Sequence, residues 1–128
     1  MNNGVLIKLT NLQNKKKDLI SSYHQIKHQK HFNYTTPKEK SDYEYLNQIH
    51  NEKLDYLKGV IKEKIENLNL IEKESKENIE EYNKLKELNN GYEEKEKKIL
   101  DDFNLYEKDL NELEELMNNF KILISQRV

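Results

Sequence analysis

Three histidines near the N-terminus have the spacing of metal ligands on a helix. His24, His28 and His31 are separated by four and three residues, so a helix would place them on one side. A zinc site also needs further ligands and hydrogen-bond partners that orient the rings. The neighbouring Lys27 and Lys30 would repel a cation. We therefore expect a solvated basic face here and no metal or other cofactor.

Carboxylates are abundant in the middle of the chain, but their setting does not suit catalysis. A general acid and a general base need a shaped, partly dry pocket that separates their pKa values. Here the carboxylates are interspersed with lysines, which suggests exposed faces held by salt bridges, at Glu72, Glu74, Glu77, Glu80, Glu81, Lys73, Lys76 and Lys84. Cysteine is absent, which excludes thiol catalysis and disulfides. We predict that the protein is not an enzyme and has no small-molecule substrate.

The glycines are isolated and form no phosphate-binding loop. A P-loop or a dinucleotide fingerprint needs clustered glycines, whereas this chain has only Gly4, Gly59 and Gly91. Gly59 lies inside a helical pattern, where it is either a tolerated weak point or the mark of a close helix crossing.

A basic tract at Lys15, Lys16 and Lys17 raises the question of anionic partners. Lysine clusters can contact nucleic acid or anionic lipid, but the sole arginine is Arg127 and the net charge is −2. Residues 1–41 hold eight lysines against two acidic residues, whereas residues 42–128 hold 14 basic against 22 acidic residues. This asymmetry favours contact of the basic segment with an acidic helix, in this chain or in a partner, over contact with lipid or nucleic acid.

The composition favours long helices over a thick globular core. Charged residues make up 36% of the chain and hydrophobic residues 34%, against roughly a quarter and nearly half in average domains. The charges nearly balance, which argues against disorder. No stretch approaches the ~20 apolar residues of a membrane span, and Lys8 interrupts the only N-terminal run that could resemble a signal peptide. We expect a cytoplasmic or nuclear protein that is neither secreted nor transmembrane.

Residues 3–31 have the spacing of a helix with one apolar stripe. Seam positions alternate by four and three, as in a heptad repeat, at Val5, Leu9, Leu12, Lys16, Leu19, Tyr23 and Ile26. Lys16 alone interrupts this seam, and Ile7 and Ile20 widen it. We predict a helix over 3–31, followed by a connection over 32–36, where modest helix formers predominate.

A second helix is predicted over 37–88. Thr36 can cap it, Pro37 suits the first helical position and Glu39 completes a capping box. The first half follows an eleven-residue pattern, which favours little or slightly right-handed supercoiling, at Leu46, His50, Leu54, Leu57, Ile61, Ile65 and Leu68. The later seam is heptad-like but includes polar residues, so we expect residues 72–90 to be the loosest helical part; these are Ser75, Asn78 and Asn89.

Residues 89–91, Asn-Asn-Gly, allow two interpretations. Glycine commonly caps a helix in the left-handed conformation, so the chain can turn or kink here. The heptad phase nevertheless runs on through Tyr92, and one glycine costs a helix only about 1 kcal/mol. A continuous helix is therefore the alternative.

Residues 92–126 have the most regular pattern in the chain. Ten positions alternate by four and three, and nine of them are apolar. We predict a helix whose apolar stripe is a partner-binding seam, formed by Tyr92, Ile99, Phe103, Tyr106, Leu110, Leu113, Met117, Phe120 and Ile124. If residues 89–91 form a turn, the earlier segments can fold back and cover this seam instead.

Together these patterns predict an all-α fold, a single elongated domain over 1–128 built as a coiled coil or helical bundle. Its aromatic seams favour three or four helices that share one core. The expected function is that of a non-catalytic subunit of a hetero-oligomeric complex, a scaffold or adaptor of the kind found in vesicle-tethering, organelle-positioning or kinetochore assemblies. Its partners would be other helical proteins or further copies of itself. The alternatives are a self-sufficient helical-bundle chaperone or binding module and, less favoured, a lipid or nucleic-acid binder.

Overall fold

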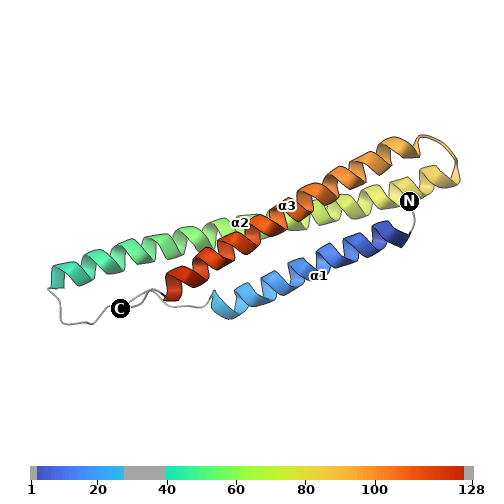
Figure 1. Cartoon of the computed structure of the whole chain (residues 1–128). Helices are drawn as coiled ribbons and strands as arrows, with labels where there is room; N and C mark the ends of the chain where they lie inside the picture. Colours follow the sequence, from blue (N-terminus) through green and yellow to red (C-terminus); the bar gives the residue numbers. More distant parts are fainter. Residues whose placement is uncertain (1–2, 28–39, 126–128) are drawn as a thin grey trace.

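Three long helices make up the part of the chain that the structure, a computed structural model, describes: residues 3–27 and 40–125. α1 spans Asn3–Ile26, α2 spans Lys40–Glu87 and α3 spans Tyr92–Ser125. These residues contain no strand. Figure 1 shows the three helices side by side in an elongated bundle. The predicted all-α fold is confirmed, while supercoiling of the helices stays a prediction.

The helix ends differ in detail from those expected. α1 ends at Ile26, its last apolar seam residue, and Lys27 lies in a turn, whereas the sequence predicted a helix to residue 31. The rest of the range predicted for this helix, residues 28–31, lies outside the described residues. The predicted connection over 32–36 and the capped start at Thr36 lie outside the described residues.

A tight turn, not a continuous helix, joins α2 to α3. Asn89 and Gly91 have positive φ angles of 51° and 64°, a left-handed conformation that glycine adopts freely and asparagine tolerates. The backbone N–H of Asn90 donates to the carbonyl of Leu85 at 3.0 Å, which satisfies one of the last carbonyls of α2. The chain therefore reverses, and α3 runs back along α2 as an antiparallel hairpin (Figure 1).

The apolar stripe of α3 forms the axis of the core. Both other helices add side chains to it, with Leu9, Leu12 and Tyr23 from α1 and Leu54, Ile61, Leu68, Ile71, Ile79 and Tyr82 from α2. The ring of Tyr23 meets that of Phe120 edge-on at 5.9 Å, an arrangement that aromatic quadrupoles favour. Hydrophobic burial along α3 is thus what holds the bundle together.

α1 rests on the hairpin mainly through α3. It runs parallel to α3 and antiparallel to α2 (Figure 1), and its contacts with α2 are few by comparison. Lys15 reaches α3, where its ammonium group lies 3.1 Å from the Asn111 side-chain oxygen and 3.5 Å from a Glu114 carboxylate oxygen. α2 begins well beyond the end of α3 in the same view. The bundle is therefore asymmetric, because both outer helices pack on α3 and approach each other closely at few places, such as Lys16 and Glu72.

No helix in residues 3–27 and 40–125 is both long enough and apolar enough to cross a lipid bilayer. The cellular compartment stays a prediction.

Candidate partner-binding site

The predicted partner-binding seam of α3 lies inside the bundle. Ile99, Phe103, Tyr106, Leu110, Leu113, Met117 and Phe120 are buried, and Tyr92 and Ile124 are half-buried against the same core. Because residues 89–91 turn, α2 folds back over the seam and α1 covers its other side. A partner would reach these side chains only after the bundle opened.

Lys16, which interrupts the seam of α1, is neutralised by a carboxylate of α2. It forms an ion pair with Glu72, to which Gln13 also donates a hydrogen bond at 2.8 Å. The hydroxyl of Tyr106 on α3 donates to the same carboxylate at 3.3 Å. Glu72 thus joins all three helices. The expectation that Glu72 belongs to an exposed face is wrong, since its side chain is only 15% exposed.

The local environment keeps both groups in the protonation states that this network needs. Burial alone would raise the pKa of Glu72, but hydrogen bonds from Lys16 and Gln13 outweigh it and hold the pKa below its ordinary value. Burial, and then the nearby Glu72 charge, raise the pKa of Tyr106. The charged Glu72 carboxylate therefore accepts a hydrogen bond from the neutral Tyr106 hydroxyl, and this network connects the helices.

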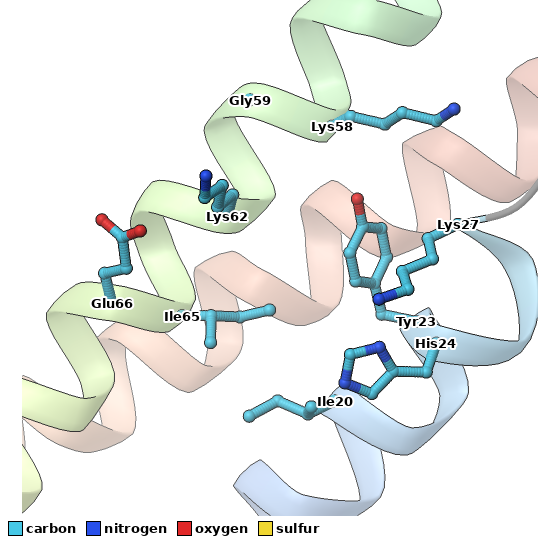
Figure 2. Close-up of a pocket in the computed structure, with 9 residues that line it drawn as sticks. All are labelled: Ile20, Tyr23, His24, Lys27, Lys58, Gly59, Lys62, Ile65 and Glu66. Carbon is cyan, nitrogen blue, oxygen red and sulfur yellow. The ribbon is translucent and has the colours of Figure 1, made fainter.

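An open groove lies between α1 and α2, on the side where these two helices scarcely touch. Its volume is about 510 Å³, and we name it the α1–α2 groove (Figure 2). Its lining comes from α1 with Ile20, Tyr23, His24 and Lys27, and from α2 with Lys58, Gly59, Lys62, Ile65 and Glu66. The lining is mostly apolar. The groove exists because α1 packs on α3 and leaves the facing side of α2 uncovered.

The floor of the groove is apolar. Ile20 and Ile65 are half-buried, and the ring of Tyr23 is buried between them and the core. Figure 2 shows the Tyr23 hydroxyl pointing from α1 toward α2. Ile20 is one of the residues that widened the predicted stripe of the first helix, and this widening was the signal in the sequence for a second contact surface.

Gly59 lies on the α2 side of the groove. A methyl group placed at its Cβ position would meet no atom within 4 Å, so no described helix of this chain crosses close to it. Of the two interpretations of Gly59, the structure favours the tolerated weak point within this chain. The glycine nevertheless leaves this wall of the groove free of side-chain bulk.

The edge of the groove is basic. Three lysines and His24 stand against the single carboxylate of Glu66. None of the ion pairs among the described residues involves Lys27 or Lys62. The groove thus combines an apolar floor with a positively charged edge.

A second, smaller groove lies between α2 and α3. Its volume is about 280 Å³, and it is lined by Lys53, Tyr56, Leu57, Asn119, Ile122 and Leu123. Tyr56 and Ile122 are exposed there. This outer groove has a less basic lining, with Lys53 as its one charged residue.

The histidine and lysine clusters of the sequence are divided by the structure. His24 lines the α1–α2 groove, whereas His28 and His31 lie outside the described residues. Within the described ranges, no three His, Cys, Asp or Glu side chains lie close enough to hold a metal ion. Lys15 and Lys16 contact α3 and α2, and Lys17 is exposed. The basic tract therefore does not form one free surface.

No protein-family model, curated protein or solved structure matches this chain.

Proposed function

We propose that the protein is a non-catalytic subunit of a hetero-oligomeric complex, which it joins by accepting a helix of another protein in the α1–α2 groove. The observation that carries this proposal is the asymmetry of the bundle. α1 and α2 both pack on α3, but between them they leave an apolar floor accessible. A fourth helix there would contact both α1 and α2 and complete a four-helix arrangement.

The dimensions of the groove suit a short helical segment. Its lining covers residues 20–27 of α1 and 58–66 of α2, which at 1.5 Å per residue is about 10–12 Å, or two turns. Burial of an isoleucine or leucine side chain contributes roughly 1.5–3 kcal/mol. A few such side chains on a partner helix would be enough for specific binding but not for an extensive interface.

The buried seam of α3 supports a chain that folds before it meets its partner. Because the strongest apolar stripe is already covered inside the bundle, folding does not require a partner to cover it. The same observation favours the alternative of a self-sufficient binding module or chaperone. Direct binding of lipid or nucleic acid through residues 15–17 is less favoured, since Lys15 and Lys16 already contact the other helices.

A matched pair of substitutions on α1 tests the proposed function. Ile20→Glu places a charge in the groove, and Ile7→Glu makes the same change at an exposed position of the same helix that does not line the groove. The tagged full chain is isolated from its native cells, and the mass of its complex is measured by light scattering. We expect Ile20→Glu to release the partner while Ile7→Glu retains it, with both variants equally helical by circular dichroism.

Two results would contradict the proposed function. One is a wild-type chain that stays a monomer in its native cells. The other is a partner that both variants retain equally well, which would place the interface elsewhere.

A further inference from the structure

The edge of the α1–α2 groove shows which kind of helix it suits. Lys27 belongs to the α1 wall of the groove, and Lys58 and Lys62 belong to its α2 wall (Figure 2). A helix lying in the groove would bring the residues on both of its flanks next to these ammonium groups. Opposite charges on those flanks would be attracted, and lysines or arginines there would be repelled.

The floor adds a second requirement. Ile20 is half-buried but is not among the side chains packed against the core, so it offers apolar surface to an incoming group. Ile65 of α2 packs against the core but is only half-buried, so part of its side chain also lines the groove. An occupant must therefore present an apolar stripe, with side chains at i, i+3 or i+4, and i+7.

We infer that the α1–α2 groove binds an acidic amphipathic helix of a partner protein, with its apolar stripe on Ile20, Tyr23 and Ile65 and its carboxylates beside Lys27, Lys58 and Lys62. This inference rests on the proposed function and specifies the partner. Tyr23 adds a polar group to this surface, because its hydroxyl points toward α2 (Figure 2) and can donate a hydrogen bond to a carboxylate.

The same observations weigh against other anionic ligands. A nucleic-acid backbone would pair with the lysines but leave the apolar floor uncovered, and single strands bind best where aromatic faces accompany the basic groups. Tyr23 already packs its ring edge-to-face with Phe120. The combination of an apolar floor and a basic edge fits helix-in-groove recognition.

A set of three peptides tests the inference on the full chain. Each is a fluorescein-labelled helix of about 18 residues, or five turns, with the same leucine and isoleucine stripe. The flanks carry glutamate in one, lysine in the second and glutamine in the third. By fluorescence anisotropy we expect the glutamate peptide to bind at least about tenfold more tightly than the lysine peptide, with the difference shrinking as salt screens the charges.

Paired charge reversals locate the binding. Lys27→Glu with Lys62→Glu should weaken binding of the glutamate peptide by about tenfold and strengthen that of the lysine peptide. Lys17→Glu with Lys108→Glu changes the net charge equally at exposed positions outside the groove lining and should leave both affinities unchanged. A duplex DNA and vesicles containing anionic lipid are measured alongside, and light scattering of the chain alone detects a homodimer.

The outcomes separate the inference from the proposed function. Equal binding of the three peptides, no binding of any, or equal effects of the two charge reversals would overturn the acidic helix as occupant. So would tighter binding of DNA or vesicles that the groove reversal abolishes, or a homodimer that it disrupts. In any of these cases, release of the native partner by Ile20→Glu alone would still support a helix-accepting groove.

Discussion

The two ends of the α2–α3 hairpin are held together in different ways. Near the turn, the hairpin tip (residues 78–102) has a narrow core, with Ile79, Tyr82 and Ile99 buried, and polar contacts between α2 and α3 beside it. Asn78 donates a hydrogen bond to Asp102 at 2.9 Å, and Lys95 forms an ion pair with Glu81. Farther from the turn, the bundle body (α1 with residues 54–75 and 103–125) buries the larger part of the apolar stripe of α3, from Phe103 to Phe120, and one charged network.

This difference shows what a third helix adds. Two helices can cover only one narrow stripe of each other, so polar pairs at the edges take a larger share of the contacts in the tip. In the body, α1 covers the second side of α3, and more side chains are fully buried, while exposed pairs such as that of Lys15 with Glu114 lie at its surface. Buried groups contribute far more than surface ion pairs, whose typical contribution is about 0–1 kcal/mol. Substitutions should therefore have larger effects in the body than in the tip.

The largest effect is expected from charges in the core of the body. Leu113→Asp with Met117→Asp puts two carboxylates where side chains are at most 2% exposed, and we expect a loss of more than about 5 kcal/mol, enough to unfold the chain. Leu100→Asp with Leu105→Asp repeats the change at exposed positions of α3 and should cost about 1 kcal/mol. Circular dichroism in urea compares them, and equal losses would remove the distinction between core and surface.

Loss of the Glu72 charge should loosen α1 selectively. Glu72→Gln keeps the shape of the side chain but leaves Lys16 half-buried without its ion pair, which we expect to cost about 1–3 kcal/mol. Hydrogen exchange should rise along α1 and stay unchanged in the tip. Glu81→Gln, which removes an exposed ion pair in the tip, should have no measurable effect on α1. Uniform loosening by Glu72→Gln would show that α1 and the hairpin unfold as one unit.

Acid should lower the stability of the body and raise the stability of the tip. The pKa of Glu72 in the folded chain lies below its ordinary value of 4.5, so its contribution is present above pH 4.5 and is lost as the pH falls through the folded pKa. Burial raises the pKa of Asp102 above its ordinary value of 3.8, although the hydrogen bond from Asn78 opposes this shift. The charged Asp102 carboxylate therefore lowers the stability of the folded chain at neutral pH, and this destabilisation disappears as the pH falls through the raised pKa.

Hydrogen exchange of the two regions between pH 7 and pH 3 should therefore shift in opposite directions, after correction for the intrinsic exchange rate. The Glu72→Gln variant should lose the acid response of α1. Parallel shifts in body and tip would contradict the assigned roles of the two carboxyl groups.

The smallest effect is expected at Ser75, where the body meets the tip. Its side chain is fully buried, and its hydroxyl has no hydrogen-bond partner among the described residues. Ser75→Ala removes this unpaired group and improves helix propensity, so we expect a stabilisation of about 0.5–1 kcal/mol. The exposed Ser21→Ala controls for propensity alone. A urea midpoint that rises no more for Ser75→Ala than for Ser21→Ala would indicate that the buried hydroxyl has no cost.

Local patterns in the sequence predicted the helices and the core, because they depend on residues close in the chain. The four-three spacing of residues 92–126 identified the stripe that the bundle buries, and Gly91 indicated the turn. The expectation that residues 72–90 are the loosest helical part stays a prediction, and Asn78 has a partner in Asp102 that the spacing did not suggest.

Features that depend on the packing of distant segments could not be predicted from the local sequence patterns. Lys16 and Glu72 are separated by 56 residues, and nothing in either local pattern indicates that they pair. The α1–α2 groove depends on α1 packing on α3 in preference to α2. A heptad seam predicts that a helix packs but does not specify against which neighbour, so the sequence predicted the α3 seam as the contact surface and missed the groove.

The contacts of α1 also bear on the order of assembly. The hydrogen bond between Asn78 and Asp102 closes a loop of 24 residues and that between Lys64 and Glu112 closes 48, whereas those of α1 with Asn69 and Asn111 close 53 and 96. Each doubling of a loop adds about 0.6 kcal/mol of closure entropy. We therefore expect the hairpin to close first, from its turn, and α1 to pack on it afterwards, so that the α1 wall of the groove forms late in folding.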